Sequence, residues 1–167
     1  TGRSIAAAPC FSTGTALVSD SETLVFKDTA NGYDTYNFDV NGTVTLTNTN
    51  IIAAGAIDFI FDASAATALT ITGGSLSGYS SFITASGQTM SGVVFAQGGM
   101  ATVANTITDS PFNQCGTITV TGTLDGCTIN KSTATTAVSA ASTVKATACT
   151  FVKDTGTSHA FELTGAA

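Results

Sequence analysis

Four aspartates are the residues of this chain whose type and spacing come closest to catalytic chemistry. Asp58 and Asp62 flank an apolar segment, and Asp109 and Asp125 follow further along the chain. Glycoside hydrolysis uses two carboxyl groups that lie roughly 5–9.5 Å apart. On an extended strand, Asp58 and Asp62 are about 13 Å apart, at about 3.3 Å per residue. We therefore expect each aspartate to lie on a turn or a solvated strand face, not in a catalytic pair.

The basic residues and the histidine do not complete a catalytic site either. A reaction of the pectate-lyase type needs a base beside calcium-binding acids, but the basic residues are scattered: Arg3, Lys27, Lys131, Lys145 and Lys153. His159 follows Ser158 and lies five residues after Asp154. A catalytic triad is assembled by folding and not by adjacency in sequence. Gly73–Gly74 and Gly98–Gly99 resemble turns and not phosphate-binding loops. We therefore expect no catalytic residue.

The cysteines are equally dispersed, at Cys10, Cys115, Cys127 and Cys149. A structural zinc site is typically built from closely spaced pairs of Cys or His ligands, and this chain has no Cys-x-x-Cys pair and one histidine. We expect neither a metal nor a cofactor. Three disulfide connectivities are open to four cysteines, and buried free thiols are the favoured alternative.

Threonine alternates with other residues in two segments, 43–49 and 117–123. Such Thr-x-Thr rows on solenoids resemble the ice-binding faces of some antifreeze proteins, which carry both threonines on every coil. At a spacing of 22 residues, the segments to compare are 106–108, 128–130 and 150–152, which read Thr-Ile-Thr, Thr-Ile-Asn and Thr-Phe-Val. Only the first threonine persists, so this register disfavours ice binding.

The overall composition favours strands. Thr, Ser and Gly together make up 65 of the 167 residues, and strong helix formers are rare. A helical bundle is thereby excluded, and 43% hydrophobic residues exclude intrinsic disorder. The net charge is −6 and Arg3 is the single arginine, which disfavours binding to nucleic acid or to an anionic membrane.

Targeting signals are weak or missing in the sequence itself. No run of 18 apolar residues occurs, and the Ile5–Pro9 stretch is too short and poorly flanked for a signal peptide. The chain begins with Thr1, so we expect it to be processed or to be a piece of a longer polypeptide.

Short segments with apolar residues at every second position are the elements that would position these side chains. In the segment 57–62, Ile57, Phe59 and Phe61 share one face while Asp58 and Asp62 share the other. Related segments recur: 105–107, 127–129 and 149–151 are each 22 residues apart, and 45–47 and 70–72 are 25 apart. A repeat of 20–25 residues with several short strands predicts a parallel β-solenoid. An antiparallel sandwich or jelly roll is the alternative, but it predicts no such repeat.

The 22-residue repeat also predicts which residues stack. We expect a right-handed all-β solenoid of about five coils over residues 42–163, with Ile107, Ile129 and Phe151 stacked inward. On the same register, two further columns are expected: Asn105 with Cys127 and Cys149 inside, and Thr106 with Thr128 and Thr150 outside.

The ends of the chain differ from the repeat. Residues 1–40 contain two predicted strands, 23–26 and 36–40, around an Asn31–Gly32 turn, and are expected to form an irregular cap or attachment element. Residues 41–167 are expected to form the solenoid. Its last predicted strand, 160–163, is followed by no recognisable cap, so we expect the solenoid to continue beyond residue 167 or to dock on another subunit.

The segments 69–78 and 122–130, which read LTITGGSLSG and GTLDGCTIN, are typical of the predicted coils in having little charge and much Thr, Ser and Gly. In this they resemble parallel β-helix modules of bacteriophage tail fibres, tail spikes and other virion appendages, and the resemblance covers residues 42–163. It implies a homotrimeric structural protein at the virion surface or outside the cell, with other virion proteins and a host-surface glycan as partners. The chain departs from the glycan-cleaving spikes in lacking an acidic catalytic cluster, which favours a fibre, adaptor or decoration role without enzymatic activity. Bacterial adhesin passengers and polysaccharide-active β-helix enzymes are the alternatives.

Overall fold

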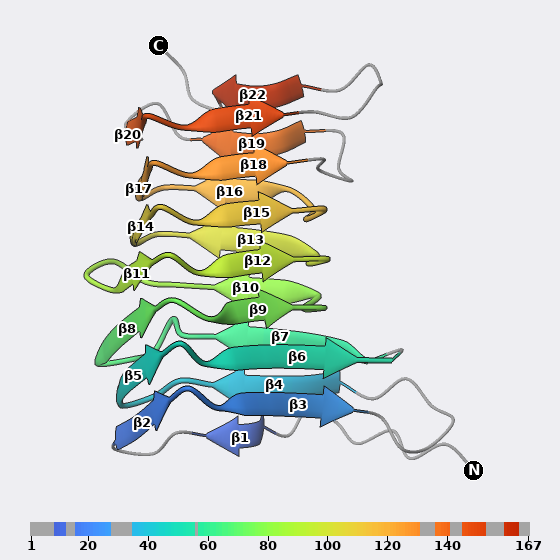
Figure 1. Ribbon diagram of the computed structural model, residues 1–167, viewed down its shortest axis with the longest axis vertical. Helices are drawn as coiled ribbons and strands as arrows, with labels where there is room; N and C mark the ends of the chain where they lie inside the picture. Colours follow the sequence, from blue (N-terminus) through green and yellow to red (C-terminus); the bar gives the residue numbers. More distant parts are fainter. Residues whose placement is uncertain are drawn as a thin grey trace.

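The computed structural model describes residues 9–12, 16–27, 35–55, 57–130, 136–140, 145–152 and 159–163, and these form strands and no helix. The strands assemble into three sheets, stacked coil upon coil (Figure 1). Neighbouring strands in all three sheets are parallel. The predicted all-β fold of parallel-solenoid type is therefore confirmed, and the antiparallel sandwich is wrong.

The chain visits the three sheets in turn. Sheet A contains β1 (Pro9–Ser12), β4 (Thr35–Asp39), β7 (Asp58–Asp62), β10 (Ser81–Ile83), β13 (Met100–Val103), β16 (Ile118–Val120), β19 (Thr136–Ala140) and β22 (His159–Leu163). Sheet B contains β2 (Ala16–Asp20), β5 (Thr43–Thr47), β8 (Ala68–Thr72), β11 (Thr89–Ser91), β14 (Thr106–Thr108), β17 (Thr123–Asp125) and β20 (Lys145–Thr147). Sheet C contains β3 (Thr23–Lys27), β6 (Asn50–Ala54), β9 (Ser75–Ser77), β12 (Val94–Ala96), β15 (Pro111–Asn113), β18 (Thr128–Asn130) and β21 (Thr150–Val152).

The first strands already belong to this stack. β2 pairs with β5 over five residues, and β3 pairs with β6 over five residues. Whether residues 1–40 cap the solenoid or attach it to another protein stays a prediction.

Each strand presents alternate residues to the core, as the period-two pattern predicts. In β5, Val44 and Leu46 are buried between more exposed threonines, and in β7, Phe59 and Phe61 are buried. The narrow interior is therefore filled by single inward side chains from the three sheets.

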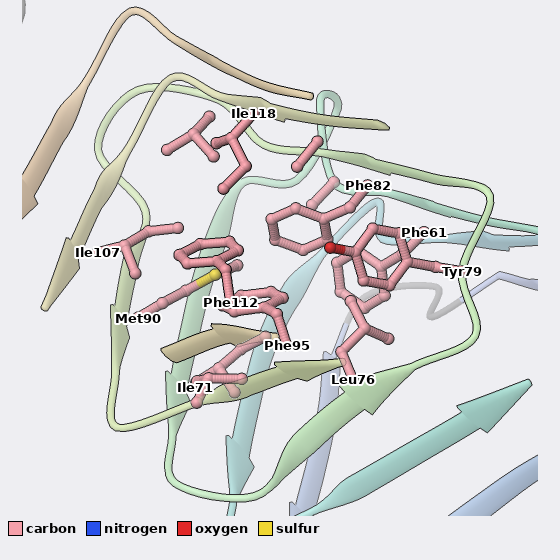
Figure 2. Packing of buried hydrophobic residues seen from close by; sticks show 14 of the residues in the cluster. Phe61, Ile71, Leu76, Tyr79, Phe82, Met90, Phe95, Ile107, Phe112 and Ile118 are labelled. Atoms are coloured by element: carbon pink, nitrogen blue, oxygen red, sulfur yellow. The ribbon is translucent and has the colours of Figure 1, made fainter. Parts of the chain in front are cut away.

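Aromatic rings run through the middle of this core (Figure 2). Phe38, Phe61 and Phe82 stack on successive strands of sheet A, with 5.3 Å between neighbouring ring centroids. Phe95 and Phe112 of sheet C stack in parallel at 4.4 Å, and Phe82 meets Phe95 across the core at 5.1 Å. Ring contacts of this kind add about 0.5–1.5 kcal/mol each to the burial of apolar area.

In every coil, one residue with a left-handed backbone conformation (positive φ) lies at the corner between sheet B and sheet C. These residues have φ between 47° and 65° and are Ser21, Asn48, Gly73, Gly92, Asp109, Gly126 and Ala148. The N–H groups of the first six donate to carbonyl oxygens on the next coil over 2.7–3.0 Å, so the ladder of hydrogen bonds continues through the corner. Gly, Asn and Asp adopt this conformation at least cost, which explains five of the seven residues.

The predicted 22-residue register holds for one step and is wrong elsewhere. Ile129 does stack on Phe151, as predicted, but the residue on its other side is Phe112 of β15. Ile107 belongs to sheet B, where it lies between Met90 and Leu124. Thr106 therefore does not share a column with Thr128 and Thr150. The physical reason is that coils differ in length: equivalent threonines of sheet B are 25, 19, 17 and 17 residues apart from Thr45 to Thr123.

The predicted column of Asn105, Cys127 and Cys149 is likewise correct only in part. Cys127 and Cys149 occupy equivalent positions on adjacent coils, directly before the paired residues Thr128 and Thr150. Asn105 precedes sheet B and accepts a 2.9 Å hydrogen bond from the Thr84 hydroxyl on its Oδ1 atom. The coil below Cys127 places Ser110 at the equivalent position, before β15.

Candidate functional site: the outer faces of the solenoid

The four candidate aspartates do not form one group. Asp58 and Asp62 lie in sheet A, whereas Asp109 and Asp125 are neighbours on adjacent coils, and the Asp109 N–H donates to the Asp125 carbonyl oxygen at 2.8 Å. Asp58 and Asp62 lie at the two ends of β7 in sheet A. Asp109 lies at the corner after β14, and Asp125 ends β17 in sheet B. The structure thus agrees with the expectation that these carboxylates occupy turns and strand faces.

A closer carboxylate pair, which the sequence analysis did not consider, lies on neighbouring strands. Asp39 of β4 is directly paired with Asp62 of β7. The pKa of Asp39 is raised, first by partial burial and then by repulsion from Asp62. The pair lies on the outward side of sheet A, and neither residue lines the cavity described below. Its proximity therefore costs stability and does not by itself make a site.

The buried thiols are held in their neutral form. Burial raises the pKa of Cys127 to about 11 and also raises the pKa of Cys115. The hydroxyl of Tyr79 donates to the Cys115 sulfur at 3.4 Å, two coils away, and the pKa of Tyr79 is raised by its own burial. Cys115, Cys127 and Cys149 do not form disulfide bonds. A nucleophilic cysteine needs a lowered pKa, so the raised pKa values of Cys115 and Cys127 favour a structural role for these two thiols.

Several predicted residues lie outside the described part of the chain. These are Arg3, Lys131, Lys153, Asp154 and Ser158, together with the side chains of Cys10 and His159. Within the described residues, no group of three or more His, Cys, Asp or Glu side chains could hold a metal ion. The described part also contains no helix long and apolar enough to cross a membrane.

A cavity of about 500 Å³ lies against β2, β3 and β4. Its lining is mostly apolar, and its titratable groups among the described residues are Asp20 and Glu22. Asp20 ends β2 and Glu22 precedes β3, so the two carboxylates flank the Ser21 corner, and this arrangement alone identifies neither a reaction nor a substrate.

Among the described residues, the outward side of sheet B carries the most regular arrangement. Two columns of hydroxyl side chains run along it, and we name this set the threonine face: Thr45, Thr70, Thr89, Thr106 and Thr123 in one column, and Thr47, Thr72, Ser91 and Thr108 in the other. Val18 and Lys145 extend the first column, and Asp20, Asp125 and Thr147 extend the second. Both columns persist because β5, β8, β11, β14 and β17 pair without any shift in register.

The side chains of the threonine face are at least partly exposed, and most of their hydroxyl groups donate no hydrogen bond to a described residue. Thr70, Thr72, Thr89 and Thr106 are exposed, and the other members are at least partly so. Within the described residues, one side-chain hydroxyl of this face donates inside the protein, that of Thr108 to the Met90 carbonyl oxygen at 3.5 Å. The remaining hydroxyls are available to solvent or a ligand.

The outward side of sheet C is different, and we name it the uncharged face. After Lys27 its strands carry no charged residue, and several outward side chains are apolar: Val25, Ile52, Val94 and Val152. Val25, Val94 and Val152 are 57%, 37% and 45% exposed. Sheet A has no comparable regularity, since its outward residues include Asp39, Ile60 and Met100.

Sequence reasoning missed the second threonine column because it aligned β14 with β18 and β21, which belong to a different sheet. The corner residue is the signal that could have corrected this. Thr-x-Thr, Thr-x-Ser or Thr-x-Asp is followed by Asn48, Gly73, Gly92, Asp109 or Gly126 in each of five coils. An alignment of the coils on these corner residues places the strands of sheet B in equivalent positions.

Comparison with protein-family models, curated proteins and solved structures found no match to this chain.

Proposed function

We propose that this chain is a non-enzymatic structural component of a virion appendage, such as a phage tail fibre, spike or decoration protein. It serves particle assembly or attachment to a host surface, and it acts at the virion surface or outside the cell. The stacked parallel sheets support this proposal, because a solenoid whose coils repeat along one axis forms an extended, mechanically continuous rod. Right-handed winding, with about five coils over residues 42–163, is part of the proposal, since parallel crossovers are almost always right-handed.

The uncharged face is the observation that carries the proposal. Exposed valines and an absence of charge along the described strands from β6 to β21 suit burial against another protein surface. Identical subunits packed around a shared axis would each contribute this face, and the proposed assembly is a homotrimer. The threonine face and sheet A would then remain on the outside of the assembly, where other virion proteins or a host-surface glycan could be contacted.

A glycan-cleaving role is less well supported by the arrangement of carboxylates. Asp39 and Asp62 are close, but they lie on the outward side of a sheet, away from the described cavity. Asp58, Asp109 and Asp125 are distributed over other strands and a corner.

The experiment is a mass measurement in solution at micromolar concentration by light scattering, for the protein and two variants. The wild-type protein is expected to have the mass of three chains. Val94→Asp places a charge on the uncharged face and is expected to give one chain, whereas Thr102→Asp on sheet A of the same coil is expected to leave three. A wild-type monomer that releases reducing ends from bacterial polysaccharide would refute both the assembly and the non-enzymatic role.

A further inference from the structure

The threonine face is periodic in two directions, and this periodicity restricts what it can recognise. Adjacent strands are about 4.8 Å apart, and residues i and i+2 of a strand are about 6.6 Å apart. The unshifted pairing from β5 to β17 repeats these two spacings over five coils. A small soluble ligand would contact one or two coils only. A partner with its own regular lattice would contact all of them.

Water fits between these hydroxyls with the geometry it has in ice. A water that is about 2.8 Å from two hydroxyl oxygens that are about 4.8 Å apart subtends an angle of roughly 120° between them. This is close to the tetrahedral angle of hydrogen-bonded water. Along a strand, the spacing of about 6.6 Å is spanned by a chain of two such waters. The face can therefore order a sheet of water with ice-like connections in both directions.

The side chains are held rigidly enough to act as a template. Threonine is branched at Cβ and has restricted χ1 rotamers, so its hydroxyl and methyl positions vary little. The residues between the two columns point inward and are fully or almost fully buried: Leu46, Ile71, Met90, Ile107 and Leu124. Ordering the side chains against a ligand thus costs less entropy than it would for long polar residues.

The chemistry of the face favours water over the other extended partners. It has no outward aromatic ring on which a sugar could stack, and in its five central coils the single charged position is Asp125. A second copy of this chain is better matched by the apolar uncharged face. We propose that the threonine face binds ice. This goes beyond the proposed function and does not rest on it.

The test uses ice itself as the probe. Protein is partitioned during slow growth of an ice hemisphere, and the shape of single ice crystals is recorded in parallel. Thr106→Lys places a long charged side chain in the middle of the threonine face. Thr102→Lys makes the same change on the outward side of sheet A, away from the uncharged face, and is the matched control. Thermal melts establish that both variants are folded, and Thr89→Lys provides a second disruption if Thr106→Lys is not.

The wild-type protein and Thr102→Lys are expected to enter the ice and facet the crystals, whereas Thr106→Lys is expected to enter at least tenfold less. Exclusion of the wild-type protein from ice would overturn the inference. Equal loss in Thr102→Lys, undiminished entry of Thr106→Lys and Thr89→Lys, or binding to crystalline cellulose but not to ice would do the same. Mass measurement of the same samples separates this outcome from the proposed function, because a trimer that is excluded from ice refutes the ice-binding face alone.

Discussion

Neighbouring residues of β18 face opposite environments, so the same substitution should have opposite severity at each. Ile129 is 2% exposed and stacks between Phe112 and Phe151, whereas Thr128 lies on the outward side. Ile129→Asp is expected to unfold the protein or lower its free energy of unfolding by several kcal/mol, because an unpaired carboxylate is buried. Thr128→Asp is expected to change the free energy of unfolding of the separated subunit by about 0.5 kcal/mol or less, and its effect on assembly is measured separately by light scattering. Chemical denaturation measures both, and equal shifts would show that the inward and outward faces are wrongly assigned.

Gly98 leaves the space that the Tyr79 ring occupies. A Cβ atom at Gly98 would overlap the ring, which is itself packed against Phe82 and Phe95 and reaches Cys115 with its hydroxyl. Gly98→Ala is therefore expected to cost about 1–3 kcal/mol of stability through overpacking.

A double-mutant cycle tests the cause of that cost. With Tyr79→Ala in the background, Gly98→Ala is expected to cost clearly less than it does alone, since the two changes share one space. If the stability losses of Gly98→Ala and Tyr79→Ala are additive, the cost of Gly98→Ala comes from the backbone at Gly98 and not from overlap with the Tyr79 ring. Tyr79→Phe keeps the ring and removes the hydroxyl, so Gly98→Ala should remain costly in that variant.

Adjacent strands also couple their charges, as β4 and β7 do through Asp39 and Asp62. The pKa of Asp39 is raised above its usual value of 3.8, so the folded state favours its protonated form. This contribution to stability is complete below that value and is lost as the pH rises through the raised pKa.

Asn cannot ionise, so the Asp39→Asn variant is expected to avoid the destabilisation that the charged Asp39 causes. It should melt at or above the wild-type temperature at pH 7. Its advantage should shrink when the pH is lowered to about 3. Melting curves from pH 3 to pH 7 provide the measurement, with exposed Asp58→Asn as the control on the same sheet. An advantage that persists unchanged at pH 3 would show that the repulsion and burial at Asp39 are not its cause.

The strands are the part of the fold that the sequence predicts well, because alternation is a local property. Val44 and Leu46, or Phe59 and Phe61, show their inward direction without reference to any other strand. The pairing of strands is not local. The segments at Thr106–Thr108 and Thr128–Asn130 look alike because both alternate around an inward isoleucine, yet they belong to sheets B and C. A single repeat length could not separate them, since corners of different length connect strands of equal form.

The same contrast between local pattern and non-local pairing applies to the candidate site. That hydroxyl-rich strands exist is evident from composition, but the second column of the threonine face appears only when β14 is placed beside β17 and not beside β18. Asp39 and Asp62, 23 residues apart in sequence, are likewise joined only by the register of β4 and β7.

At the scale of the whole molecule, the three sheets have separate properties although one core supports them all. The uncharged face is suited to packing between subunits, the threonine face to an ordered external surface, and sheet A carries the paired carboxylates of Asp39 and Asp62. Because each coil contributes one strand to every sheet, lengthening the rod extends all three surfaces at once.

The left-handed corners make each coil a removable unit of length. Asp109 and Gly126 occupy the same corner one coil apart, so excising residues 109–125 joins Thr108 directly to Gly126 and moves β18 onto β12. We expect the shortened chain to fold with the same strand content and a rod about 4.8 Å shorter, which circular dichroism and small-angle scattering would detect. Excising only residues 109–117 would put β16 and the corner after it out of phase and should abolish folding. Evolution could then lengthen or shorten this fold by inserting or deleting whole coils. Related chains would in that case differ in length by whole coils.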